Sequence, residues 1–281
     1  MTLDTAALTL RPLTSADLLA AQALTAGFDW PHRLEDWALM HRLGRGIVAE
    51  QDGAVAGTAL CWLYGMDRAS LGMIAVPRAL QGQGLGRRLM QELIDELGDR
   101  VIQLHATEAG LPLYQSLGFS QVGTVRQHQG TAAQTMPVPG QRLRPVADRD
   151  LLALAALDRA ACGMDRNGLL AALIETASGV ILERGGDDVG FALLRPFGRG
   201  HVIGPVVAPD VSGAKALLLQ LLGTMAGQFV RVDVPEKTGL SPWLEGLGLA
   251  DVGTVIRMVR GDNAGGAGRV RSFALASQAF G

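Results

Sequence analysis

The segment SLGMIAVPRALQGQGLGRRLMQELIDELG, residues 70–98, joins a short strand pattern to a helix pattern through a glycine-rich loop. Leu71–Val76 is an apolar run closed by a proline, and its length favours a buried strand over a helix. From Leu85 onward leucines recur every four residues, which predicts a helix with one apolar face that ends at Gly98. The glycines of the loop therefore lie at the predicted start of the helix.

Glycines at a helix start are typical of an anion site, because the first helical turn has unpaired N–H groups and a partial positive charge. Gly82, Gly84 and Gly86 let the main chain approach phosphate oxygens with no Cβ in the way. Their spacing is G-x-G-x-G and not the dinucleotide fingerprint G-x-G-x-x-G, and no Walker-type Lys-Ser/Thr pair follows Gly86. The loop predicts a phosphate site of another kind.

Gln81, Gly84 and Gly86 fit the Gln/Arg-x-x-Gly-x-Gly/Ala signature of the GNAT-type N-acetyltransferase superfamily, which the chain resembles over residues 10–130. The preceding strand ends in Ala-Val-Pro, as the family's fourth strand does, and LPLYQSLGF at residues 111–119 is similar to the family's helix and strand entry. The resemblance implies an α/β (α+β) fold with a mixed, mostly antiparallel central sheet flanked by helices. It also implies a splayed strand pair that binds acetyl-coenzyme A as cosubstrate.

The resemblance implies roles for individual residues. Main-chain groups of the fourth strand bind the pantetheine arm and the thioester, while the loop and helix start hold the pyrophosphate. The implied cofactor-binding residues are Ile74, Ala75, Val76, Gln81, Gly82, Gly84, Gly86 and Arg87. Tyr114 stands where the family often has a tyrosine that protonates the departing thiolate, and a half-buried structural aromatic is the alternative.

The family's reaction is direct attack of an amine on the thioester in a ternary complex, so the amine's proton needs an acceptor. The glutamate that many relatives carry on the fourth strand is absent from LGMIAV. The remaining candidates are His32, Glu35, Asp36, His41, Glu50, His105 and Glu108, and the sequence singles out none of them. His105, within an apolar run, is more typical of an interior histidine. Trp30, Arg33 and Glu35 lie where GNAT domains build the acceptor pocket and are candidate substrate-binding residues.

The chain contains the same domain twice. LRPLTSADLLA at residues 10–20 returns as LRPVADRDLLA at 143–153, with seven of eleven positions identical. LGFSQVGTV at 117–125 returns as LGLADVGTV at 247–255, with six of nine identical. Matches in the same order at nearly constant offset indicate a tandem duplication.

We expect a catalytic GNAT domain over residues 1–138 and a degenerate GNAT-like domain over 139–281. The second half keeps the fold signals but loses the chemical ones in an ungapped alignment. Opposite the loop glycines and Tyr114 this alignment places Ala214, Ala216, Leu218 and Leu244. Asp165 and Arg166 are interpreted either as acceptor-site residues at the domain junction or as a buried ion pair. Residues 269–281 are expected to form a final strand.

Composition narrows the function further. A net charge of −2 without a basic cluster argues against nucleic acid as a partner. No run reaches the roughly 18 uncharged apolar residues of a membrane helix, and we expect a cytoplasmic protein with reduced cysteines and no metal. The sequence thus predicts an acetyl-coenzyme A-dependent N-acetyltransferase for a small-molecule or peptide amine. The alternatives are a non-catalytic acyl-coenzyme A sensor and a chain whose second half binds its own ligand. The oligomeric state is not predicted.

Overall fold

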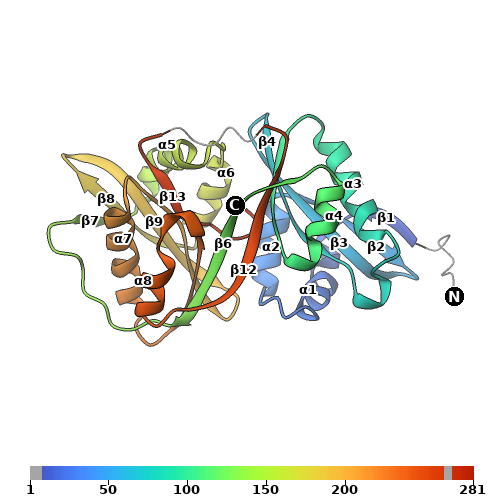
Figure 1. The fold of residues 1–281 in the computed structure, drawn as a ribbon, viewed down its shortest axis with the longest axis horizontal. Coiled ribbons are helices and arrows are strands. Elements are labelled where there is room, and N and C mark those ends of the chain that lie inside the picture. The colour runs from blue at the N-terminus through green and yellow to red at the C-terminus, as the bar shows by residue number, and fades with distance from the viewer. Residues whose placement is uncertain (1–7, 263–267) are drawn as a thin grey trace.

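The computed structural model describes residues 8–262 and 268–281, and it places the two halves side by side (Figure 1). The first half contains β1 (Leu8–Pro12), α1 (Leu18–Ala26), α2 (Leu34–Leu43), β2 (Arg45–Gln51), β3 (Ala54–Tyr64), β4 (Arg68–Ala75), α3 (Leu85–Leu97), β5 (Val101–Ala106), α4 (Leu111–Ser116) and β6 (Ser120–Thr131). The second contains β7 (Arg142–Pro145), α5 (Leu151–Cys162), α6 (Asn167–Ile174), β8 (Ser178–Arg184), β9 (Asp187–Phe197), β10 (Gly200–Ala208), α7 (Val211–Thr224), β11 (Phe229–Pro235), α8 (Ser241–Gly246), β12 (Ala250–Arg260) and β13 (Arg271–Ala274). Apart from β13 the two orders are identical, which confirms the duplication.

The strands of both halves join into one mixed sheet. Its strand order is β1-β2-β3-β4-β5-β12-β6-β11-β10-β9-β8-β7. The remaining strand, β13, is not part of this order and pairs with β10. Two pairs are parallel, β4 with β5 and β10 with β11, and the others are antiparallel. The mixed, mostly antiparallel sheet that the sequence predicted is therefore present, with a parallel pair at the same place in each half.

The halves exchange their last strands at the centre of the sheet. β12 of the second half pairs with β5 of the first, and β6 of the first half pairs with β11 of the second. The two exchanged strands also pair with each other, so that Val125 lies opposite Val255. These valines are equivalent positions of the repeat, so the halves meet about a local pseudo-twofold axis, as the subunits of a symmetric dimer do.

Helices cover both faces of the sheet (Figure 1). In the first half α3 and α4 pack on one face, where the leucines of α3 predicted from the four-residue period are buried. α1 and α2 pack on the other face, and their core continues without a break into that of α5 and α6. We call this second side the α1/α2 face. No helix among the described residues is long and apolar enough to cross a membrane.

Residues 70–98 fold as the sequence predicts, with small shifts at the ends of the elements. The strand expected over Leu71–Val76 is β4, which begins three residues earlier, and the helix over Leu85–Leu97 is α3. Gly98 follows the helix at a φ of 61°, a left-handed value that favours glycine. The final strand is shorter than expected, because only Arg271–Ala274 is extended and the residues after it turn.

Candidate cofactor slot and the junction of the two halves

β4 and β5 separate along their length. They pair over Arg68–Leu71 and not beyond. At Met73 the chain takes a φ of 55°, unusual for a residue with a side chain, and the register with β3 shifts at this point. The Thr58 hydroxyl donates to the Met73 carbonyl at 2.8 Å, which holds the bulge in place. The main chain of the predicted residues Ile74–Val76 is thus left without a ladder partner on the β5 side.

The glycine loop follows this opening directly. Gly82 and Gly84 have φ values of 76° and 81°, and a Cβ at either would meet no atom within 4 Å. Both therefore border open space while holding a backbone shape that only glycine adopts readily. The side-chain amide of Gln81 donates to the Val76 carbonyl at 2.9 Å and fixes the loop against the strand end.

The start of α3 provides free N–H donors. Its N-cap is Gly84, which has no side chain to cap the first turn. The unpaired N–H groups and the positive end of the helix dipole thus face the same open loop. A diphosphate fits this arrangement, since it needs several donors and close approach to main chain.

Gly86 and Arg87 differ from the other loop residues. A Cβ at Gly86 would lie 3.4 Å from Leu113, so this glycine also serves the close packing of α3 on α4. Arg87 is exposed, and its guanidinium donates to the Ser116 hydroxyl at 2.6 Å. The structure thus places both residues at the loop, with Arg87 tied to α4.

Tyr114 lies on α4 in the core that also contains Val76 and Leu85. Its ring packs edge-on against Phe119, and the side chain is buried. Burial raises the pKa of this phenol to about 12. The side chain therefore stays protonated at physiological pH and is able to donate a proton.

The equivalent slot of the second half is filled by the chain itself. β10 and β11 pair only over His201–Val202. β13 then pairs with the free edge of β10, and the N–H of Leu275 donates to the Asp233 carbonyl on β11 at 2.9 Å. A strand of the protein thus lies where an extended cofactor arm would lie between separated strands.

The second half also lacks the loop. β10 ends at Ala208 and α7 begins at Val211, so two residues stand where the first half has nine. One of them, Asp210, caps α7 by accepting the Gly213 N–H at 2.7 Å. A carboxylate therefore occupies the helix start that is free in the first half.

This geometry corrects the ungapped alignment of the two halves. Ala214, Ala216 and Leu218 are buried inside α7 and do not replace the loop glycines. The loop is deleted and not substituted. The alignment is correct later in the chain, because Leu244 lies on α8 at the position that corresponds to Tyr114 on α4.

The predicted acceptor residues lie together at the junction of the halves. Arg33 forms an ion pair with Asp36 at 2.9 Å at the start of α2, and Asp36 also accepts the Gly198 N–H of the β9–β10 turn. Trp30 is half-buried, and Glu35 is exposed. Asp36, which Arg33 orients, thus joins the first half to the β9–β10 turn of the second.

His32 belongs to the same contact. Its ring lies edge-on to Phe197 of the second half, with 5.4 Å between ring centres. Burial, with smaller effects of nearby arginines, lowers its pKa to about 4. His32 is therefore neutral at physiological pH and packs as an aromatic ring.

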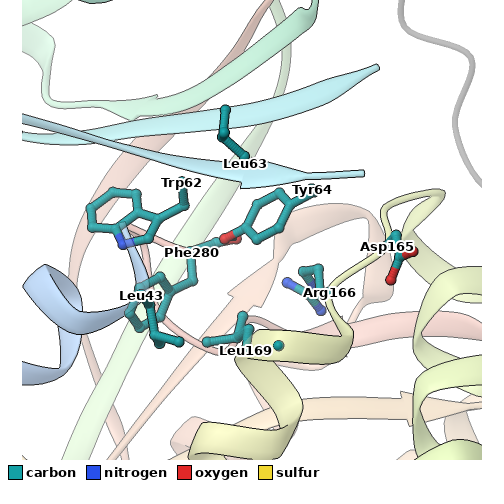
Figure 2. Close-up of a pocket in the computed structure, with 9 residues that line it drawn as sticks. Leu43, Trp62, Leu63, Tyr64, Asp165, Arg166, Leu169 and Phe280 are labelled. Atoms are coloured by element: carbon teal, nitrogen blue, oxygen red, sulfur yellow. The ribbon is translucent and has the colours of Figure 1, made fainter. Parts of the chain in front are cut away.

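The interpretation of Arg166 as half of a buried ion pair is correct, with a different partner. Its guanidinium pairs with Asp158 at 2.6 Å, and each side chain is 1% exposed. Asp165 instead stands at the rim of a pocket of about 340 Å³, part of it open solvent, between the halves (Figure 2). The pocket also contacts Tyr64, whose hydroxyl donates to the Phe280 carbonyl at 2.9 Å. Among the described residues no three His, Cys, Asp or Glu side chains gather as a metal site.

Comparisons with known proteins agree with this geometry. Residues 16–119 match the profile described as "Acetyltransferase (GNAT) family", and residues 154–269 match that described as "Acetyltransferase (GNAT) domain". N-alpha-acetyltransferase RimI of Mycobacterium tuberculosis is 33% identical over 150 residues, which cover 48% of this chain and 95% of RimI. The uncharacterized N-acetyltransferase YitH of Bacillus subtilis is 32% identical over 173 residues, 60% of this chain and 61% of YitH.

A crystal structure shares the whole architecture. A Pyrococcus horikoshii protein assigned as an acetyltransferase superposes with a TM-score of 0.83 at 20% identity, covering 98% of this chain and 96% of its own. The chain belongs to the GNAT family of N-acetyltransferases and carries two GNAT domains in tandem.

Proposed function

We propose that the chain is an acetyl-coenzyme A-dependent N-acetyltransferase whose catalytic unit is the first half, residues 1–138, and whose second half, 139–281, is a degenerate GNAT-like domain. The observation that carries this proposal is the difference between two equivalent slots. The first has separated strands, an open glycine loop and an uncapped helix, whereas the second contains β13 and the Asp210 carboxylate.

In this proposal the main chain of Ile74–Val76 orients the thioester, and the loop from Gln81 to Arg87 holds the diphosphate. Acetyl-coenzyme A supplies the activated acetyl group. The acceptor is an amine of a peptide or a small molecule. A peptide α-amine is the first acceptor to test. The alignment with RimI covers 95% of RimI, and RimI is by name an N-alpha-acetyltransferase.

The test is transfer by the full chain. Incubation with acetyl-coenzyme A and a lysine-free peptide with a free α-amine should release free thiol and add one acetyl group to the peptide, measured by mass spectrometry. Acetyl-coenzyme A binding with no thiol release for peptide, polyamine or aminoglycoside acceptors would contradict the proposal and favour the sensor alternative.

Tyr114→Phe should lower kcat by about 100-fold or more, because the departing thiolate loses a proton donor. Affinity for acetyl-coenzyme A should stay within about twofold, since the ring and its packing remain. Stopped-flow kinetics and calorimetry measure the two quantities. Wild-type turnover in the variant would leave Tyr114 a structural residue.

A further inference from the structure

His105 stands at the point where β4 and β5 separate. The last paired position on β5 is Leu104, so His105 is the first residue past the paired segment. Leu104 and Ala106 point into the core under α3, and alternation along the strand directs His105 to the α1/α2 face. The His105 side chain therefore lies on the face of the sheet opposite α3.

The last turn of the described chain packs on this part of the face. A Cβ at Gly72, beside His105 across the opening, would lie 3.3 Å from Cα of Ala279. The same segment crosses β10 at Gly204, the equivalent of Gly72, where a Cβ would overlap the Leu275 carbonyl. A single stretch, residues 271–281, thus fills the slot of the second half and then reaches the slot of the first.

This turn determines which nitrogen of His105 carries the proton. Nδ1 lies 2.8 Å from the carbonyl oxygen of Gln278, and a carbonyl only accepts hydrogen bonds. Nδ1 is therefore protonated in the neutral ring, and Nε2 presents a lone pair. Nε2 is buried and has no hydrogen-bond partner among the described residues, while the His105 residue as a whole is half-buried. A buried unpaired acceptor is rare in folded proteins and calls for an explanation such as catalysis.

The charged groups around the ring come from the neighbouring strands. Arg257 on β12 lies opposite His105 and donates to the Gln103 side chain at 3.0 Å, while Asp233 lies on β11. Burial, above all, and Arg257 lower the pKa of His105 to about 4, against the opposing effects of the Gln278 carbonyl and Asp233. The ring is thus neutral throughout the physiological range, and Nε2 keeps its lone pair.

We propose that Nε2 of His105 accepts the proton that the acceptor amine loses, and that the Gln278 carbonyl positions the ring for this step. The proposal rests on the proposed function of the first half. The amine nitrogen forms the new N–C bond to the acetyl carbon as the C–S bond breaks. The amine's proton passes to Nε2, and the Tyr114 hydroxyl gives a proton to the sulfur. His105 is a catalytic residue in this scheme, and Gln278 is a positioning residue contributed by the second half.

The experiment replaces His105 by glutamine in the full chain, with acetyl-coenzyme A and a lysine-free peptide carrying a free α-amine as probes. We expect kcat to fall by about 100-fold with unchanged affinity for acetyl-coenzyme A. Between pH 6 and 9 the remaining rate should rise more steeply with pH than that of the wild type, because solvent hydroxide replaces the lost base. Imidazole added to His105→Ala should restore part of the rate.

His201→Gln is the matched control, since His201 also has a buried ring nitrogen without a hydrogen-bond partner in the described part of the chain, but lies on β10. It should leave kcat unchanged. Wild-type kcat and pH dependence in His105→Gln, or equal loss in both variants, would overturn the inference while leaving the proposed function intact. Absence of transfer by the wild-type chain would overturn the proposed function, and this inference with it.

Discussion

Gly84→Leu is expected to weaken acetyl-coenzyme A binding by about 1,000-fold or more, equivalent to about 4 kcal/mol. The leucine side chain would enter the open space where the diphosphate is proposed to lie, directly over the uncapped start of α3. It would also force a side chain into a backbone conformation with a φ of 81° and a ψ of 0°, which costs about 1–2 kcal/mol. Isothermal titration calorimetry with acetyl-coenzyme A measures the change in affinity.

The control separates backbone strain from the loss of the site. Gly239 has a φ of 69° and a ψ of 16°, and a Cβ there meets nothing within 4 Å, but it lies beside α8 in the second half. Gly239→Leu should lower the thermal midpoint about as much as Gly84→Leu and leave affinity unchanged. Equal affinity in the two variants would show that the loop does not hold the cofactor.

The sequence predicted the parts of the fold that depend on local pattern. The leucine period of α3 and the stop at Gly98 require only neighbours along the chain, so both are readable without a structure. The duplication is visible because fold signals such as the glycine at 118 and at 248 recur. Both glycines have positive φ values after a short helix, and both copies of the turn need them.

Strand exchange could not be predicted for a physical reason. The strands that contain Val125 and Val255 share the sequence Val-Gly-Thr-Val at equivalent positions, so this local pattern does not specify which half each strand joins. Which edge each strand occupies depends on the whole arrangement of the halves, which a local pattern does not encode. The sequence likewise does not predict that β13 pairs with β10, because the periodicity of a strand does not specify which strand it pairs with.

The candidate site likewise has parts that a local sequence pattern predicts and parts that it does not. The glycine loop and Tyr114 were identified from a short motif, and the structure places them on one core, although their roles remain proposals. Arg33 is a candidate because it lies where GNAT domains build the acceptor pocket, and that position does not predict its ion pair with Asp36. His105 was one candidate among several, because its partner, the Gln278 carbonyl, lies 173 residues away in sequence.

Asp158→Ala should destabilise the chain by about 3–5 kcal/mol, because it leaves the Arg166 guanidinium buried without a counter-charge. Both side chains are 1% exposed, so water cannot replace the lost carboxylate. Glu175→Ala is the control, since it breaks an ion pair with Arg42 whose two side chains are about half exposed. That change should cost at most about 1 kcal/mol. Urea denaturation measures both.

The same variant tests whether the turn at residues 277–281 supports catalysis. Arg166 also donates to the Gly281 carbonyl, in the turn whose Gln278 carbonyl contacts His105. Loss of Asp158 removes the group that fixes Arg166, so the turn should loosen and kcat should fall at a temperature where the variant is still folded. Affinity for acetyl-coenzyme A should persist, because the loop at Gly84 belongs to the other face of the sheet. A loss of stability with unchanged kcat would show that the ion pair contributes only to folding and that the turn does not affect the reaction.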